Sequence, residues 1–185
     1  MTDPEPKVSK ILMVFAHADD ETLLAGALIA SLVSDGNNVT VLCLAPGDDD
    51  RTSRLHKACA VLGVDAVETL RYVEGAMWRD ELDEASSASE ELKLMPALSV
   101  VPVDDLASRV SGRISEINPN IVITHSVHDD YRHPDHAAVY EACSVRLRGR
   151  LRHVETVCAQ LAAMDGEIQY STDEAGWSKY QKNGT

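Results

Sequence analysis

Two short segments of this 185-residue chain concentrate residue types that bind metal ions and move protons. The first, FAHADDE, follows the apolar run ILMVFA and contains His17, Asp19 and Asp20. A histidine and an aspartate three residues apart at a strand-to-helix turn can converge on one ion, while Asp19 points elsewhere in the pocket. Helix capping is the alternative, although capping needs one acid and three consecutive acids repel one another unless a cation is present. This segment alone leaves both interpretations open.

The second segment, HSVHDDYRHPDH, holds four histidines and three aspartates within residues 125–136. Pro134 suits the first turn of a helix, which would direct His133 and His136 back over a sheet edge. We expect His125 and His128 to be supporting or surface groups. Mixed imidazole and carboxylate ligands from two strand ends are typical of a catalytic divalent metal, with Zn²⁺ the first expectation and Fe²⁺ or another first-row ion the alternative.

The elements that must position these residues alternate along the chain. Apolar runs predict strands at Lys10 to Ala16, Val39 to Ala45, Val67 to Val73 and Ile121 to Thr124. Helical patterns cover Thr22 to Ser34, about Thr52 to Leu62, Asp104 to Ile117 and the segment that begins at Pro134. Strands separated by helices predict a Rossmann-like three-layer α/β/α fold with a mainly parallel sheet. Both polar segments then lie at the carboxyl ends of strands, where such sheets bind ligands.

The composition narrows the class of protein. The length and the 44% hydrophobic content predict one domain over residues 1–185, and the polar sequence of residues 165–185 favours partial disorder there. A net charge of −13 argues against nucleic acid and membrane surfaces as partners. We expect a small-molecule substrate and leave a homo-oligomer open.

Localisation and redox state follow from two further features. The polar start MTDPEPKVSK is not the apolar core of a signal peptide, which favours a cytoplasmic protein. The four cysteines are widely spaced in apolar surroundings and form no CxxC pair. We therefore expect reduced core thiols, with a disulfide or a cysteine metal site as the lesser alternative.

Both motifs resemble those of a known family. AHADDE is similar to the AHPDDE signature, and HPDH to the second signature, of the LmbE-like or PIG-L-like zinc N-deacetylases, and the likeness extends over about Lys10 to Ala142. The resemblance implies removal of an acetyl group from N-acetylglucosamine-type conjugates or related amides. It implies metal ligation by His17, Asp20 and His136.

The resemblance also implies roles for other residues. Asp19 corresponds to the general base, His133 to the group near the oxyanion and leaving amine, and Tyr131 to an oxyanion-stabilising tyrosine. Asp48 and Arg51 correspond to a region that helps to hold substrate. Ala18 stands where the family usually has proline, and the chain after about Arg150 does not resemble the usual C-terminal strands, so the substrate is not predicted.

Two other functions fit parts of the sequence. A metal-dependent phosphohydrolase also uses histidine and aspartate clusters, but no glycine-rich phosphate loop follows a strand, and Arg132 is the lone cation within the second cluster. A flavodoxin-like binding domain explains the first acidic pair but leaves the second histidine cluster without a role. A non-catalytic sugar- or metal-binding domain of the same fold stays an alternative, although the chain carries every residue that the resemblance assigns to the catalytic core.

Overall fold

The computed structural model describes residues 8–75, 96–125 and 133–147, together with three short strands nearer the C-terminus. These strands are β5 (Val154–Thr156), β6 (Gln169–Thr172) and β7 (Ser178–Gln181). Within residues 165–185 the structure describes only β6 and β7, which pair antiparallel. The single domain and the partly disordered tail stay predictions.

A five-stranded parallel sheet forms the centre of the fold. Its other strands are β1 (Lys10–His17), β2 (Asn38–Ala45), β3 (Ala66–Thr69) and β4 (Ile121–Thr124), in the order β3-β2-β1-β4-β5. Each neighbouring pair runs parallel, which confirms the predicted sheet. The third strand is shorter than predicted: it ends at Thr69, and Val73 instead forms an isolated bridge with Ala97.

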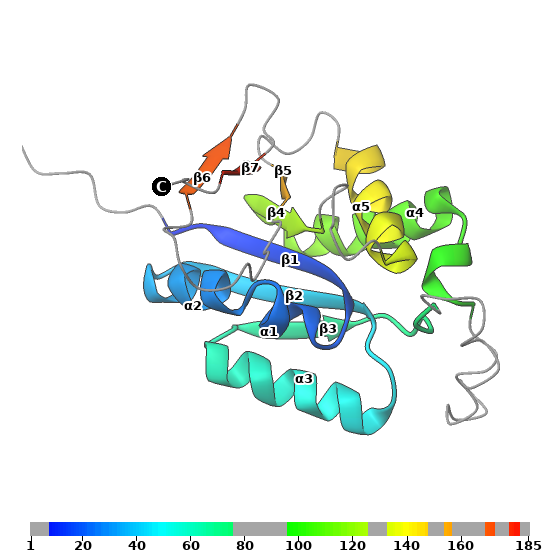
Figure 1. Ribbon diagram of the computed structural model, residues 1–185, viewed down its shortest axis with the longest axis horizontal. Helices are drawn as coiled ribbons and strands as arrows, with labels where there is room; N and C mark the ends of the chain where they lie inside the picture. Colours follow the sequence, from blue (N-terminus) through cyan, green and yellow to red (C-terminus); the bar gives the residue numbers. More distant parts are fainter. Residues whose placement is uncertain are drawn as a thin grey trace, which may run out of the picture.

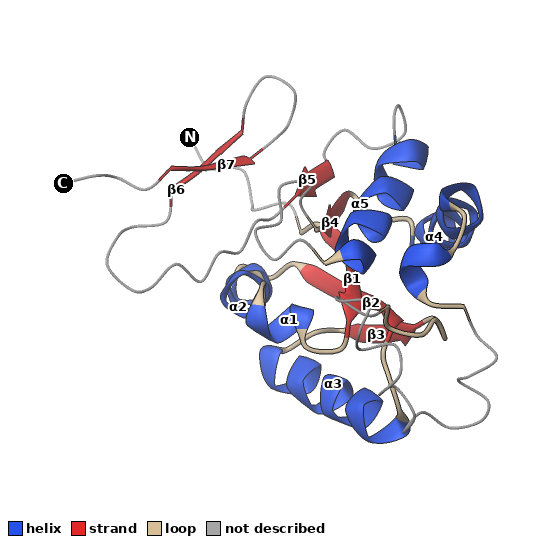
Figure 2. Cartoon of the chain, turned by 45° about the vertical axis from the view of Figure 1, so that its right-hand side comes forward, coloured by secondary structure: helices blue, strands red, loops and turns tan. Residues whose placement is uncertain are grey.

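Helices cover both faces of this sheet (Figures 1 and 2). One face carries α1 (Asp20–Leu23), α2 (Gly26–Ser34) and α3 (Asp49–Leu62), and the other carries α4 (Val103–Ile117) and α5 (Pro134–Leu147). Along β1, Leu12 and Val14 face one core and Met13 and Phe15 face the other, because successive side chains alternate across a strand. Two buried faces account for the continuous apolar run and confirm the three-layer architecture.

Three helix boundaries differ from or refine the predictions. The single helix expected over Thr22 to Ser34 is two, α1 and α2, separated by a turn. Gly63 ends α3 in the left-handed conformation, as its sequence position predicts. Helix α4 begins at Val103, one residue before the predicted start at Asp104, and Pro102 occupies its N-cap position.

The connections locate the carboxyl edge at which a ligand can bind. The chain runs from β1 outward to β2 and β3, then returns through a short 3-10 helix, η3 (Leu98–Val100), and α4 to β4 on the other side of β1. The strand order therefore reverses between β1 and β4, and in open α/β sheets ligands bind beside such a point. In the part of the chain that the structure describes, no helix has the length and apolar character needed to cross a membrane.

Candidate metal centre

The first motif forms the turn between β1 and α1. His17 is the last residue of β1 and Asp20 the first of α1, and both are buried. Asp20 Oδ2 accepts the backbone N–H of His17 at 2.8 Å, which fixes the carboxylate beside the imidazole. Asp19 occupies the N-cap position, but its side chain makes no capping hydrogen bond and is 48% exposed. Capping therefore does not account for Asp19.

The second motif forms the start of α5. Pro134 opens the helix as predicted, because its missing N–H is one that no helical partner would satisfy. His133 precedes the helix, Asp135 and His136 lie in its first turn, and all three are buried. Contacts between α5 and β1 place these residues over the end of β1, next to His17.

Three side chains from the two motifs face one another. His136 Nε2 lies 3.3 Å from His17 Nδ1 and 3.3 Å from Asp20 Oδ1. Asp20 Oδ2 lies 3.7 Å from His17 Nδ1. Two ligand atoms bonded tetrahedrally to one zinc ion are about 3.3 Å apart, given bonds of about 2.0–2.1 Å. The donor atoms and their spacing therefore fit a divalent first-row metal ion, and the structure brings together the three side chains expected to hold it.

The surroundings of the cluster change the pKa values of Asp20 and His133. Burial raises the pKa of the Asp20 carboxyl, but hydrogen bonds and charge interactions with His125 and His136 outweigh it and hold the pKa far below its ordinary value. Burial lowers the pKa of His133, and the neighbouring His17 lowers it further. An ionised carboxylate is the form of Asp20 that metal binding requires.

His125 supports the cluster from behind. It is buried after β4, and its Nε2 accepts the backbone N–H of Ala16 at 2.9 Å. Its ring stacks on that of His136, with centroids 3.9 Å apart. His125 is thus a supporting group, one of the two positions expected from the sequence. His128 lies outside the described residues.

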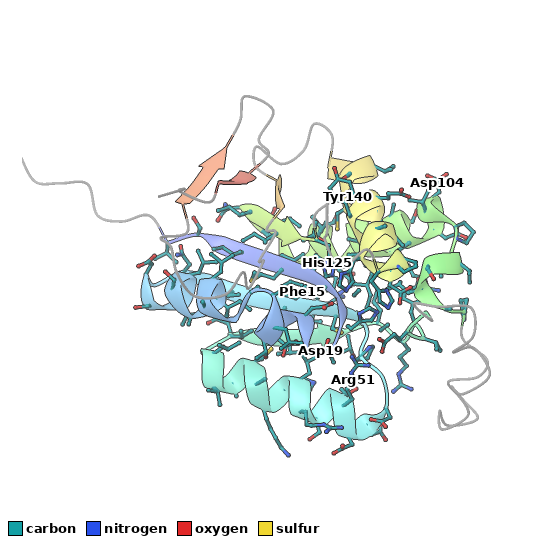
Figure 3. All side chains as sticks on the ribbon, in the orientation of Figure 1. Phe15, Asp19, Arg51, Asp104, His125 and Tyr140 are labelled. Atoms are coloured by element: carbon teal, nitrogen blue, oxygen red, sulfur yellow. The ribbon has the colours of Figure 1, made fainter. Side chains whose placement is uncertain are left out.

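More exposed charged side chains lie beside this buried cluster, and we call Asp19, Asp48, Arg51 and Glu74 the rim. Arg51, in the first turn of α3, donates from Nη2 to Asp19 Oδ2 at 3.0 Å and from Nε to the Ala18 carbonyl at 3.2 Å (Figure 3). Its Nη1 donates to Glu74. Asp48 is the N-cap of α3 and accepts the backbone N–H of Arg51 at 2.8 Å. The predicted substrate-binding pair therefore lies at the rim, where Arg51 ties Asp19 to Glu74.

The sequence analysis did not predict two residues of this site, Asp135 and Glu74. Asp135 lies inside the HPDH motif but was given no role, although its carboxylate is fully buried against His17. Glu74 had no local signal, because only the return of the chain after β3 brings it to Arg51. The remaining predicted catalytic residue, Tyr131, lies outside the described residues.

The fold and the cluster define a class: a parallel α/β protein with a histidine and aspartate metal-binding group at the switch point of its sheet. The chain belongs to the PIG-L family, described as GlcNAc-PI de-N-acetylase, whose pattern it matches over residues 12–146. This confirms the family that both motifs resemble.

Curated relatives carry the name 1D-myo-inositol 2-acetamido-2-deoxy-alpha-D-glucopyranoside deacetylase. The chain is 30% identical to the one from Mycolicibacterium gilvum over 194 residues, which cover 91% of this chain and 66% of the relative. It is 28% identical to the one from Tsukamurella paurometabola over 155 residues, or 71% and 52% of the two chains. The chain thus spans about half the length of several relatives that it matches.

Solved structures share the fold. A deacetylase of the teicoplanin biosynthesis pathway superposes with a TM-score of 0.61 at 19% identity, covering 90% of this chain and 78% of that one. N,N'-diacetylchitobiose deacetylase from Pyrococcus horikoshii gives a TM-score of 0.56 at 18% identity, covering 74% and 48%. The 4-carboxy-2-hydroxymuconate hydratase GalB from Pseudomonas putida gives 0.51 at 21% identity, covering 76% and 56%. The fold therefore accommodates more than one reaction.

Proposed function

We propose that this chain is a zinc-dependent N-deacetylase that hydrolyses the acetamide of an N-acetylglucosamine-type conjugate. The observation that carries the proposal is the convergence of His17, Asp20 and His136 at the spacing of metal ligands, next to an exposed aspartate. The PIG-L family and the names of the curated relatives support the same reaction.

The proposed chemistry divides between the ion and the protein. His17, Asp20 and His136 would hold the ion, which when bound supplies Lewis-acid polarisation of the amide carbonyl and makes water more acidic. Asp19 would take the proton of the attacking water as the new C–O bond forms. Asp19 or His133 would then deliver a proton to the amide nitrogen as the C–N bond breaks, which releases acetate and an amine. Tyr131 remains the proposed oxyanion donor on the basis of its place in the motif.

The charges at the rim support an uncharged sugar substrate. Asp19 and Glu74 are both partly exposed carboxylates, and Asp48 and Asp49 lie exposed at the start of α3. Arg51 is shared between two of these carboxylates, so it does not present an unpaired positive charge. A phosphorylated or carboxylated ligand would meet repulsion here, whereas sugar hydroxyls can bond to both partners.

The same arrangement disfavours a phosphohydrolase. Such an enzyme needs cations around the transferred phosphoryl group, and Arg51 is already committed to Asp19 and Glu74. A non-catalytic domain of the same fold leaves Asp19 without a reason to stand beside the cluster. Each alternative predicts no acetate release from an N-acetylated sugar.

The test of this proposal measures bound metal and turnover in the same variants. We expect about one zinc or iron per chain by elemental mass spectrometry, lost in both Asp20→Ala and His136→Ala, and amine release from N-acetylglucosamine conjugates that follows the metal content. Asp104→Ala, in an exposed first turn of α4, is the control for a lost acid. A parent protein that takes up no metal after zinc is supplied at neutral pH would overturn the mechanism.

A further inference from the structure

Asp135 is not one of the three candidate metal ligands, but its buried carboxylate contacts one of them. Its side chain is fully buried in the first turn of α5, and Oδ2 lies 2.9 Å from His17 Nε2. The same oxygen accepts the backbone N–H of Gly75 at 2.7 Å. One carboxylate oxygen therefore joins the end of β1, the segment after β3 and the start of α5.

The contact with His17 determines which imidazole nitrogen is available to a metal. An ionised carboxylate only accepts hydrogen bonds, so the proton of a neutral His17 lies on Nε2. Nδ1 then carries the lone pair, and it is Nδ1 that faces His136 Nε2 and Asp20. Carboxylates that fix a metal-binding histidine in this way are common partners of metal ligands.

Asp135 contacts His133 through its backbone N–H and not through its carboxylate. Its Oδ2 lies 4.0 Å from His133 Nδ1, beyond hydrogen-bond distance, whereas its backbone N–H donates to that nitrogen at 3.2 Å. A neutral His133 consequently carries its proton on Nε2. The carboxylate and the backbone amide of one residue thus set the tautomers of two histidines with different proposed roles.

Gly75 has no side chain, which leaves room for the Asp135 carboxylate. A Cβ at position 75 would lie 2.7 Å from Asp135 Oδ1 and 2.5 Å from Ser99 Oγ. Both distances are shorter than real Cβ contacts, so any side chain at this position would displace the Asp135 carboxylate or the Ser99 hydroxyl. The absence of a Cβ at Gly75 therefore lets its N–H reach Asp135.

We propose that Asp135, held by the Gly75 N–H, is a positioning residue that orients His17 so that Nδ1 points into the metal centre. The inference rests on the proposed metal-dependent function. It assigns Asp135 no contact with substrate, and it makes Gly75 part of the same device although Gly75 lies 60 positions away.

Metal affinity tests this proposal without relying on turnover. Competition between the 185-residue chain and a chromophoric chelator would measure the zinc dissociation constant of the parent, Asp135→Ala, Asp135→Asn and Gly75→Ala. We expect zinc to bind about 10- to 100-fold more weakly to Asp135→Ala, the usual effect of losing such a partner. Asp135→Asn keeps an acceptor for His17 and should recover part of the affinity, and Gly75→Ala should lose affinity.

Asp104→Ala is the matched control, because Asp104 is also an acid in the first turn of a helix but lies exposed on α4. It should bind zinc as the parent does. Folded Asp135→Ala with parental zinc affinity would overturn the inference. If Asp135→Ala does not fold, folded Gly75→Ala with parental affinity overturns it instead. Failure of the parent itself to bind zinc would be a failure of the proposed function, so the two results are distinguishable.

Discussion

The candidate metal centre has a buried half and an exposed half, and they are built differently. His17, Asp20 and His136 come from the end of a central strand and the first turns of two helices, and each is at most 5% exposed. At the rim, the side chains of Asp19 and Glu74 are 48% and 38% exposed and are joined by Arg51. The buried half is fixed by the sheet, whereas the rim depends on the connections after three strands.

This difference separates two kinds of energetic effect. In the buried half, a lost partner leaves a charge or polar group without solvent, which is costly. Ion pairs at the rim are screened by water and contribute about 0–1 kcal/mol to stability. Substitutions in the buried half should therefore change metal binding, and substitutions at the rim should change turnover while the metal stays bound.

Asp19→Asn gives the largest effect expected at the rim. It keeps the shape of the side chain but removes the proposed base, so kcat should fall by about 10²- to 10⁴-fold. Steady-state kinetics and elemental analysis of the same sample would measure both quantities. Zinc content should stay at the parental value, because Asp19 is not among the three grouped ligands. Loss of zinc in this variant would show that the two halves are not separable, and unchanged kcat would remove Asp19 from the mechanism.

Arg51→Ala should have a smaller effect. The guanidinium fixes Asp19, the Ala18 carbonyl and Glu74 at once, and its removal should lower kcat/KM about tenfold with no loss of zinc. Arg51→Lys should recover little, since an ammonium cannot make the same forked contacts. Arg54→Ala is the matched control, because Arg54 lies on the same helix in an exposed pair with Asp50. An equal loss in both variants would indicate damage to α3 rather than a role at the rim.

The sequence allowed prediction of the parts of this comparison that depend on local pattern. β1, β2 and β4 follow from apolar runs, and the start of α5 follows from Pro134. The grouping of His17 with His136 was also predictable, because parallel strands that flank a switch point end at the same edge. In each case the position in the sequence determines the position in the fold.

Other features depend on contacts between distant segments. Asp135 meets Gly75, and Arg51 meets Glu74, only after the chain beyond β3 has returned to the sheet edge. The turn that divides the helix expected over Thr22 to Ser34 has no proline or glycine inside it to mark it, since Gly26 already belongs to α2. A pattern of hydrophobicity along the sequence does not predict contacts between distant segments or a turn of this kind.

Asp48→Ala distinguishes substrate binding from a structural role at the rim. The side chain caps α3 through the Arg51 N–H, so its loss should lower the free energy of unfolding by about 1 kcal/mol. Asp48→Asn should retain most of that stability, because asparagine is an equally good N-cap. Urea denaturation would measure the stability, and KM would measure substrate binding. A raised KM in Asp48→Asn at parental stability would favour the substrate-binding role that the family resemblance implies.

The smallest effect is expected from alkylation of the buried cysteines, because their thiols should not react in the folded protein. Cys43, Cys59 and Cys143 are buried, and burial raises the pKa of Cys43 well above its ordinary value and those of Cys59 and Cys143 to about 12. The thiolate is the reactive form, so iodoacetamide at pH 8 should leave all three unmodified in the folded protein and alkylate them in urea. Peptide mass spectrometry would locate the label before and after chelation of the metal. Labelling of Cys43 only after chelation would show that β2 needs the bound ion to keep Cys43 buried. The buried half would then not be fixed by the sheet alone.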